Sequence, residues 1–447
     1  MPKVLQLSGT PNTSLGSALT RWAALGDTWV DFTVSLSASE ANGQTVFRSA
    51  GVLSNLWCFV STNTRNGSTT INTRKALANG AGIITVPSST TGNFEDVSNT
   101  DTVTVGDLWN VQCVVAGTTG SIFLRNVRTV FDATSNSVAR HTCPASAGST
   151  AAATYYFSPG GRRDANNTVE ANAEIYIGSS ATSRNYFVNV ATNSRNGTST
   201  FRTRKNGANG NMSISIPSST TGTFEDSANS DSLVAGDLYC FQNIHGGSSG
   251  TLTPTIQSVE SESTNGSMFH IYSRPGSGNS VTAGLIQGVP ISGEAPSFAA
   301  SETNIKHITS FETVFSRLSI YVASNSVTDP PDDSFLRFRV AAASTALTIP
   351  ITAGLSGRLT DITNTVTVAT ATQINYQIEI GLGDGVGSVN FRTISLTSLL
   401  QAGLKISAFE ADSKRSLDRQ SLRGSDKNSV RKDLVLSSQV RPFDDAD

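Results

Sequence analysis

Polar and apolar residues alternate along much of the chain with a period of two, which is typical of β-strands that have one buried face. Met212–Ile216 and Thr365–Val368 alternate strictly. Leu56–Val60 is apolar without interruption, so we expect a central strand that is covered on both faces or lies at a sheet interface. No amphipathic helical pattern of useful length separates these segments. The pattern therefore predicts an all-β chain.

Turn-forming residues separate the alternating segments at intervals of roughly 8–12 residues. In the first part of the chain they include Asn66-Gly67, Asn79-Gly80 and Gly106-Asp107. Seven or eight short strands at this spacing are typical of a β-sandwich, and they favour a jelly roll.

An internal repeat organises the chain. Asn55–Gly120 aligns without a gap on Asn185–Gly250, and a third, more divergent copy follows. The period is far longer than the roughly 20–50 residues of a solenoid repeat, so each copy is expected to fold around its own core. The residues shared by the copies are Glu40, Asn42, Asn63, Arg74, Pro87, Asp96 and Asn99 in the first, Glu170, Asn172, Asn193, Arg204, Pro217, Asp226 and Asn229 in the second, and Glu302, Asn304, Asn325, Arg337, Pro350, Asp361 and Asn364 in the third.

The repeat predicts three tandem antiparallel β-sandwich modules, jelly-roll-like in connectivity, followed by a charged C-terminal tail. Segments rich in Ser, Gly and Asn indicate linkers between the modules. The expected division is an N-terminal segment at 1–20, module 1 at 21–131, a linker at 132–151, module 2 at 152–262, a linker at 263–282, a divergent module 3 at 283–400, and a charged tail or docking arm at 401–447.

The tail differs in composition from the rest of the chain. It is densely charged and has few apolar residues, so it cannot build a core of its own. One interpretation is a solvated tail. The other is an arm that orders on a neighbouring subunit, where a large wrapped surface offsets the entropic cost of ordering. The apolar anchors of such an arm would be Leu434, Val435, Val440 and Phe443.

Charge and hydropathy exclude several classes of protein. The chain has 447 residues, a net charge of -2 and only 15% charged residues, so no general attraction to nucleic acid or to an anionic membrane is expected. Met1–Gly26 lacks the apolar segment of a signal peptide, and no apolar stretch approaches the roughly 18 residues of a transmembrane helix. We therefore expect no nucleic-acid partner, no membrane insertion and no cleaved signal peptide.

Acidic residues suggest one catalytic hypothesis. Glu95-Asp96 with Asp101, repeated as Glu225-Asp226 with Asp231, has the residue types of a carboxylate pair for glycoside cleavage. The alternative is a loop that is capped by hydrogen bonds to the carboxylates. An aspartate recurs in all three copies with an asparagine three residues later, whereas an active site needs to appear only once. We therefore interpret the recurring residues as part of the scaffold, and we expect no catalytic residue and no enzyme.

Basic residues suggest a second hypothesis. Arg65, Arg74 and Lys75 recur as Arg195, Arg204 and Lys205, and they form either a basic strip for an anionic glycan or a solvated face with local ion pairs. The acidic residues of the same modules favour local pairs.

No cofactor or metal ion is expected. Cys58, Cys113, Cys143 and Cys240 lack the spacing of a metal site, and we expect buried free thiols, with a Cys58–Cys113 bridge as the alternative. His141-Thr142-Cys143 has no second ligand cluster nearby. Asp329–Asp333 contains two prolines, which indicate a rigid loop rather than a calcium site.

The signature residues resemble a known type of module. The runs Asn63–Gly67, Pro87–Asp96 and Gly106–Leu108, with their counterparts in the second copy, resemble the Ser/Thr-rich tandem jelly-roll structural proteins of tailed bacteriophages, of the head decoration, fibre or tail attachment type. The resemblance covers copies one and two well and copy three in part. It implies decoration of a virion or host attachment, usually as a symmetric oligomer, and it carries over no binding residue.

These observations lead to a functional hypothesis. We expect a non-enzymatic virion structural protein of a tailed bacteriophage at the virion surface, either a head decoration or fibre or a tail-associated host-attachment component. The expected partners are further copies of the chain, other virion proteins bound through a terminus, and a cell-surface glycan. The alternative is a bacterial surface or secreted adhesin or filament subunit, exported without a cleaved signal peptide. Tandem modules suit either role because they multiply weak contacts.

Overall fold

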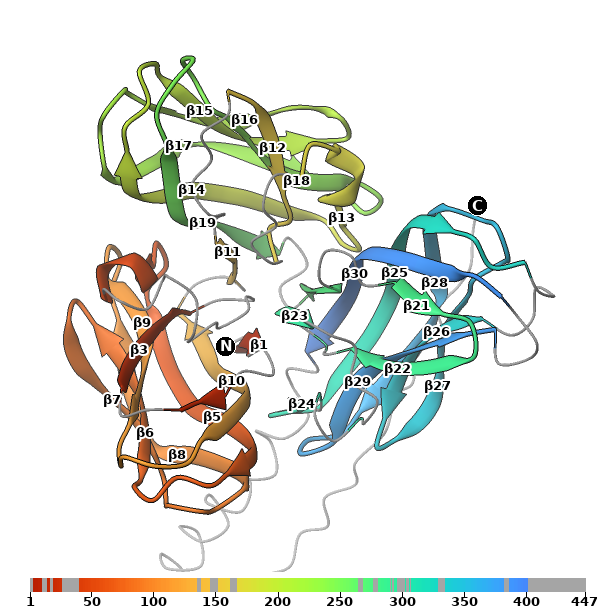
Figure 1. Cartoon of the computed structure of the whole chain (residues 1–447), viewed down its shortest axis with the longest axis horizontal. Helices are drawn as coiled ribbons and strands as arrows, with labels where there is room; N and C mark the ends of the chain where they lie inside the picture. Colours follow the sequence, from red (N-terminus) through yellow and green to blue (C-terminus); the bar gives the residue numbers. More distant parts are fainter. Residues whose placement is uncertain are drawn as a thin grey trace, which may run out of the picture. The chain divides into compact units, whose positions relative to one another are not determined.

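The computed structural model describes residues 3–9, 14–16, 19–25, 40–134, 138–144, 152–160, 167–263, 268–275, 280–289, 291, 293–295, 302, 305, 307–328, 334–381 and 386–400. Within these ranges the chain forms β-strands and two short 3-10 helices, η2 (Glu40–Gly43) and η3 (Glu170–Asn172), and it contains no α-helix. The all-β prediction is therefore confirmed (Figure 1). The charged tail with its four anchors, Asn304 and the 329–333 loop lie outside the described residues.

Module 1 is a sandwich of two antiparallel sheets. One has the order β1-β10-β5-β8 and the other β3-β9-β6-β7, with β2 and β4 as short additions to β10 and β9. If the eight long strands are numbered along the chain, these orders are 1-8-3-6 and 2-7-4-5, which is the connectivity of a jelly roll. The strands are β1 (Lys3–Gly9), β2 (Ser14–Leu15), β3 (Leu19–Ala24), β4 (Thr45–Val46), β5 (Gly51–Asn63), β6 (Thr69–Lys75), β7 (Ala78–Val86), β8 (Gly92–Val103), β9 (Leu108–Val115) and β10 (Ile122–Ala133).

Module 2 repeats this connectivity. Its sheets have the orders β11-β19-β14-β17 and β12-β18-β15-β16, and β13 pairs with β18 as β4 pairs with β9. The strands are β11 (Val138–Pro144), β12 (Thr154–Phe157), β13 (Ile175–Tyr176), β14 (Ala181–Asn193), β15 (Ser199–Lys205), β16 (Ala208–Ile216), β17 (Gly222–Leu233), β18 (Leu238–Ile244) and β19 (Leu252–Ser263).

Module 3 keeps the connectivity and adds strands at its edges. One sheet has the order β23-β20-β30-β25-β28 and the other β22-β29-β26-β27. The pair β20–β23 is parallel, in contrast to the antiparallel ladders of the other described strand pairs. The strands are β20 (Met268–Pro275), β21 (Ser280–Thr282), β22 (Leu285–Val289), β23 (Gly293–Ala295), β24 (His307–Ile308), β25 (Thr313–Asn325), β26 (Phe335–Val340), β27 (Ala343–Pro350), β28 (Gly357–Val368), β29 (Gln373–Ile380) and β30 (Ser388–Leu400).

Strand pairing moves the module boundaries relative to the sequence prediction. β1 lies in the expected N-terminal segment, β11 in the first expected linker and β20 in the second, yet each pairs with the last strand of its module. The first strand of a jelly roll finds its partner more than a hundred residues later, so little in the local sequence marks it as part of the module. Module 1 therefore begins with β1, module 2 with β11 and module 3 with β20.

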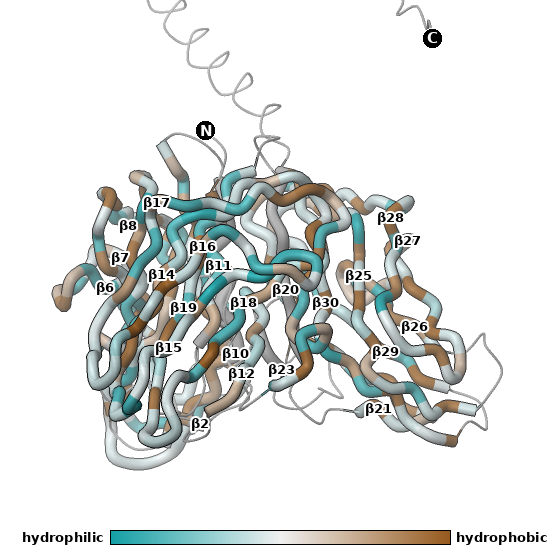
Figure 2. The backbone as a smooth tube through the Cα atoms, turned by 90° about the horizontal axis from the view of Figure 1, so that it is seen from above, coloured by the Kyte–Doolittle hydropathy of each residue, from teal (hydrophilic) through white to brown (hydrophobic). Residues whose placement is uncertain are grey.

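Each module encloses its own hydrophobic core, as the repeat predicted. Apolar and polar positions alternate along the strands (Figure 2). The strictly alternating segment Met212–Ile216 buries its apolar residues and exposes its serines. In β5, by contrast, Leu56 and Cys58 enter the core while Trp57 and Phe59 on the opposite face are also buried. The expectation of a strand covered on both faces is thus confirmed.

Candidate functional site

The aspartate that recurs in every copy closes a β-bulge. In module 1 the bulge falls between Ser54 and Leu56 of β5, where Asn55 adopts a positive φ of 51°. Asp96 of β8 lies opposite, and it accepts hydrogen bonds from the backbone N–H groups of Ile83 at 2.8 Å and Asn99 at 3.1 Å. The Asn99 side chain donates a further bond at 2.9 Å. The carboxylate therefore satisfies a backbone donor of the bulged segment of β8 and ties this segment to β7 of the other sheet.

The same arrangement recurs in the other two modules. Asp226 accepts bonds from the backbone N–H groups of Ser213 at 2.9 Å and Asn229 at 3.1 Å. Asp361 accepts bonds from Thr348 at 3.2 Å and from Asn364 at 3.1 Å. Burial alone would raise the pKa of these carboxyl groups, but the hydrogen bonds outweigh it and hold each pKa below its usual range. A saturated carboxylate of this kind stays ionised and is a poor proton donor.

The neighbouring glutamates point away from these aspartates. Successive residues of a strand project to opposite faces, so Glu95 and Asp96 do not form a pair. Glu95 lies 3.4 Å from the Arg128 guanidinium on the outer face of module 1, and Glu225 forms an ion pair with Arg48. The adjacent carboxylates are thus committed to different contacts rather than to one cleft.

A glutamate–arginine pair recurs beside the 3-10 helices. Arg74 donates to both carboxylate oxygens of Glu40, at 2.9 and 2.7 Å. Arg204 makes the same two bonds to Glu170, both at 2.9 Å. The pairs tie η2 and η3 to β6 and β15. The Asn42 side chain lies outside the described part of the structure. The Asn172 side chain donates to the Asn167 side chain at 3.4 Å.

In module 3 this pair is formed by a residue other than the one predicted. Arg339 donates to Glu302 at 2.8 Å, while Arg337 donates to Glu379 at 2.9 Å. The expectation that Arg337 is the counterpart of Arg74 is therefore wrong. Residues two apart on a strand share a face, so a shift of two positions preserves the polar pattern, and the sequence alone could not distinguish the two arginines.

An asparagine fixes the turn after the equivalent strands β5, β14 and β25. Asn63 donates to the Pro87 carbonyl at 3.0 Å, and Asn193 donates to the Pro217 carbonyl at 2.9 Å. In module 3, Asn325 donates to the carbonyl of Thr352 at 2.8 Å. Pro350 instead ends β27, so its assignment as the third counterpart is wrong. The contact uses only a backbone carbonyl, which any residue type can supply.

Two arginines of the expected basic strip are internal. Arg65 is fully buried and donates to the carbonyls of Ala116 at 2.7 Å and Gly120 at 2.7 Å. Arg195 is buried in the same way against Gly246 and Gly250. These side chains hold the loop that follows β9 or β18, a role that neither sequence interpretation anticipated.

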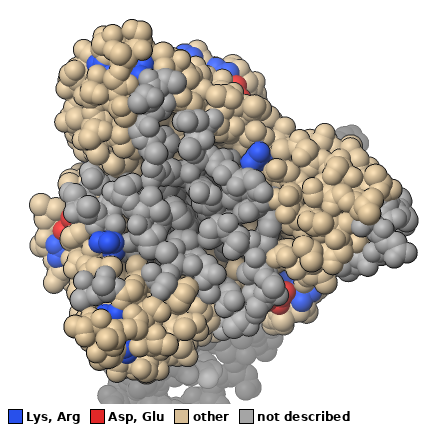
Figure 3. Space-filling view, in the orientation of Figure 1, with Lys and Arg blue, Asp and Glu red and all other residues tan. Residues whose placement is uncertain are grey.

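The remaining basic residues form local pairs, as the second interpretation expected. Lys75 lies 2.6 Å from Asp107, and Lys205 lies 3.1 Å from Asp237. On the face drawn in Figure 3, lysine and arginine occur in small separate groups rather than in a continuous strip. The described part of this face thus offers no extended basic surface to an anionic polymer.

A second buried carboxylate links three strands in modules 1 and 2. Asp231 accepts hydrogen bonds from the Thr203 hydroxyl at 2.6 Å, the Asn211 backbone at 2.6 Å and the Tyr239 hydroxyl at 3.1 Å. Asp101 bonds to the Thr73 hydroxyl and the Ala81 backbone, both at 2.5 Å. Strand register places Phe338 and Val366 at the corresponding positions of module 3. The third copy thus replaces a buried polar pair with an apolar pair.

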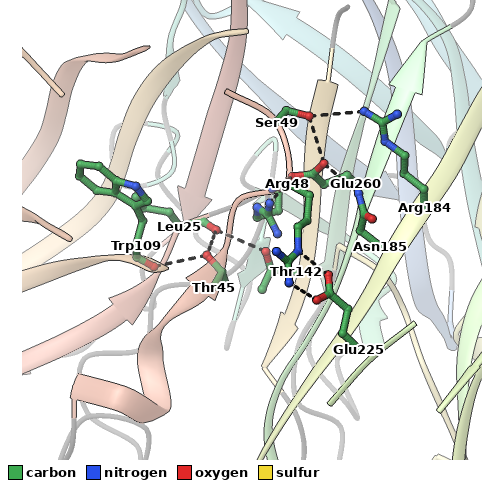
Figure 4. A network of polar contacts seen from close by, with 11 residues as sticks. Leu25, Thr45, Arg48, Ser49, Trp109, Thr142, Arg184, Asn185, Glu225 and Glu260 are labelled. Atoms are coloured by element: carbon green, nitrogen blue, oxygen red, sulfur yellow. Dashed lines mark hydrogen bonds and ion pairs between the residues drawn. The ribbon is translucent and has the colours of Figure 1, made fainter. Parts of the chain in front are cut away.

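A polar network joins modules 1 and 2 (Figure 4). Glu260 of β19 accepts bonds from the Arg48 backbone at 2.8 Å and from the Ser49 hydroxyl at 3.2 Å, and it forms an ion pair with Arg140. Arg140 and Glu260 are 2% and 1% exposed. Burial lowers the pKa of Arg140, although Glu260 opposes this shift. The Arg140 guanidinium also lies 4.5 Å from the Phe47 ring centroid.

An apolar cluster accompanies this network. Val46 of β4 packs against Phe187 of β14 and Ile256 of β19, which project from the outer face of module 2. Beside them, Asn189 donates to the Ala41 carbonyl in η2 at 2.9 Å. The outer face of the β11-β19-β14-β17 sheet therefore packs on the edge of module 1 that contains η2 and β4.

Modules 2 and 3 meet through corresponding surfaces. The Arg358 side chain and the Thr393 hydroxyl, both of module 3, donate to the Glu174 carbonyl of module 2 at 2.9 Å each. Burial lowers the pKa of Arg358 to about 10 and raises that of the Glu174 carboxyl. Gly178 faces Thr397, whose hydroxyl lies where a side chain at 178 would begin. Here too an outer sheet face packs beside a 3-10 helix.

The described residues contain no cluster of His, Cys, Asp or Glu that would hold a metal ion. Cys58, Cys113, Cys143 and Cys240 are buried free thiols, so the alternative Cys58–Cys113 bridge is wrong. Burial raises the pKa of Cys113 to about 12, which keeps this thiol protonated and unreactive. Among the described residues no helix is long and apolar enough to cross a membrane. No protein-family model matches the sequence, and a search of curated proteins finds no matching sequence.

Proposed function

We propose that this chain is a non-enzymatic structural protein of a tailed bacteriophage, either a head decoration or fibre or a tail-associated host-attachment component. The observation that carries the proposal is the use of the recurring polar residues. Inside their own modules, Asp96 and Glu40, with their counterparts, accept hydrogen bonds from backbone or arginine donors, and Asn63, with its counterparts, donates to a backbone carbonyl. What repeats along the chain is therefore scaffold, and the modules present Ser/Thr-rich strands outward.

The exposed tip of the bulge supports a role in surface contact. Val97 is 67% exposed, and Ile362, which holds the same position after Asp361, is 58% exposed. Module 2 has Ser227 at this position, so the apolar tip occurs in modules 1 and 3, and two such tips on one chain multiply weak contacts into avidity. Under this proposal the chain lies at the virion surface, assembles with further copies and other virion proteins through a terminus, and contacts a cell-surface glycan.

Peptide mass spectrometry on gradient-purified particles from the source culture tests the proposal. Copy numbers comparable to the major shell protein would identify a head decoration, and a few to a few dozen copies would identify a fibre or tail protein. Peptides that are absent from particles but present on cell envelopes or in the cell-free medium would overturn the proposal. They would favour a bacterial adhesin or filament subunit instead.

A further inference from the structure

The two described interfaces use the same positions of the repeat. Phe47, Ile177 and Thr309 each donate a backbone hydrogen bond to the turn before β9, β18 or β29, at 2.8, 2.8 and 3.0 Å. The residues that follow them, Arg48, Gly178 and Ser310, are therefore equivalent. Arg48 meets Glu260 of module 2, and Gly178 meets Thr397 of module 3.

Strand register identifies the opposite member of each pair. Glu260 pairs with Arg184, Thr397 with Ser316 and Val130 with Ser54, and each of these partners directly precedes the residue with positive φ in its bulge. Val130, Glu260 and Thr397 are therefore equivalent. In each described pair, Arg48–Glu260 and Gly178–Thr397, an edge residue of one module meets a face residue of the next. The equivalent positions outside these pairs are the edge residue Ser310 of module 3 and the face residue Val130 of module 1.

The outer face of module 1 is covered. Trp57, Phe59 and Val130 are only 2%, 5% and 2% exposed, although none of them belongs to the core of module 1. Arg128 on the same face is 2% exposed, and its guanidinium lies 4.9 Å from the Trp57 ring centroid. A sheet face that carries these side chains and is removed from solvent requires a neighbouring surface.

Module 3 supplies described residues to this region. β1, the first strand of module 1, lies against β23 of module 3. His307 of β24 is fully buried, and burial with the nearby positive charge of Arg128 lowers its pKa to about 3. His307 precedes Ser310 by three residues, so the edge that would pair with Val130 lies close to the outer face of module 1.

We propose that the outer sheet face of module 1 packs on the β24 edge of module 3, so that the three modules close into a cycle within one chain. The partner for each outer face is then the preceding module, with module 3 preceding module 1. The inference does not depend on the proposed function. It implies that any assembly of several copies uses surfaces other than these faces.

The closing interface differs from the first in its polar contacts. At the first interface Glu260 binds Arg140, Arg48 and Ser49. At the closing interface, Nε and Nη1 of Arg128 and both ring nitrogens of His307 have no hydrogen-bond partner.

Engineered cysteine pairs in the full-length chain test the closure. The S310C/V130C variant, oxidised with diamide, should give an intrachain disulfide at every protein concentration, detected by non-reducing peptide mapping. The positive control is G178C/T397C, since the ideal Cβ position at Gly178 lies 3.2 Å from Thr397 Cβ, close to the 3.5–4.5 Å of disulfides. The mismatched pair G178C/V130C should remain reduced.

Two outcomes would overturn the proposal. One is S310C/V130C remaining reduced while G178C/T397C oxidises, and the other is a disulfide that forms only between chains. If the double variant fails to fold, maleimide labelling of V130C decides the question. Closure predicts labelling at least tenfold slower than for V97C at the exposed bulge tip, independent of dilution. Fast labelling, or protection that is lost on dilution, contradicts it.

Discussion

Replacing Asp101 with valine should destabilise module 1 through its hydrogen-bonding partners rather than through lost volume. Asp101 is 7% exposed and lies between β6, β7 and β8. It accepts bonds from the Thr73 hydroxyl and from the backbone N–H groups of Ala81 and Gly82. Gly80 allows this close approach, because an ideal Cβ at 80 would lie 2.4 Å from the Thr73 hydroxyl and 2.8 Å from the carboxylate.

The size of the effect follows from which donors lose their acceptor. In D101V, Ala81 N–H loses its bond to the carboxylate, whereas Gly82 N–H keeps a bond of 3.1 Å to the Thr73 hydroxyl and Thr73 keeps one of 3.3 Å to the Gly82 carbonyl. At about 1–3 kcal/mol for a donor left without its acceptor, the loss of this one partner should cost about 2 kcal/mol. D101N retains an acceptor of the same shape and should lose about 1 kcal/mol.

The assay is urea unfolding followed by tryptophan fluorescence. All four tryptophans, Trp22, Trp29, Trp57 and Trp109, lie in the first copy of the repeat, so the signal reports on module 1. With a slope of about 2 kcal/mol per molar urea, the midpoint of D101V should fall by about 1 M.

A double-mutant cycle measures the interaction between Thr73 and Asp101 apart from their contacts with other residues. T73V/D101V approximates the apolar pair Phe338 and Val366 of module 3, and it should be less destabilised than the sum of the single variants by about 1–2 kcal/mol. Strict additivity, or a D101N variant as unstable as D101V, would refute the reasoning.

Three further predictions concern other contacts. R339A should destabilise module 3 by about 1–2 kcal/mol, measured as a lower urea midpoint by circular dichroism. The loss should exceed that of R337A, because only Arg339 binds Glu302. Equal effects would contradict the corrected alignment. Burial and Arg195 lower the pKa of His245 to about 4, whereas a histidine in the unfolded chain has a pKa of about 6.5. The free energy of unfolding should therefore fall as the pH drops from about 6.5 to about 4. H245L should reduce this difference in urea titrations at pH 7 and pH 4.5. E260Q should remove the ion-pair partner of the buried Arg140 and leave Glu225 as a nearby negative charge. It should cost about 3 kcal/mol at the interface of modules 1 and 2, measured by calorimetry against E262Q, whose partner Arg184 is 34% exposed.

The repeat identified equivalent residues correctly where the structure needs one particular type of side chain. Asp96 and Asn99 recur because a bulge needs a carboxylate and a local amide to satisfy its backbone donors. The prediction was wrong for Pro350, because the contact in question needs only a carbonyl group. It was wrong for Arg337, because a shift of two residues leaves the face of a strand unchanged.

Other features had no local signal in the sequence. Arg65 carries the same charge as Arg74, yet its surroundings are loop carbonyls that the chain supplies some fifty residues later. The outer sheet faces are buried by other modules. Their apolar residues therefore look like core residues in the sequence, and their charged residues look like surface residues, although both are buried at an interface. Trp57 beside Arg128 is the clearest example, since only contact between distant parts of the chain explains the burial of both.

The pairing of first and last strands has a consequence for synthesis on the ribosome. β1 is made first but finds its hydrogen-bonding partner, β10, only after Ile122–Ala133 has left the exit tunnel, and β11 and β20 wait in the same way for β19 and β30. Until then each nascent module carries an open sheet edge, which is prone to pair with other chains. Such long-range closure also slows folding. A ribosome that pauses before the last strand of a module would therefore leave that module unable to complete its first sheet, whatever the quality of the strands already made.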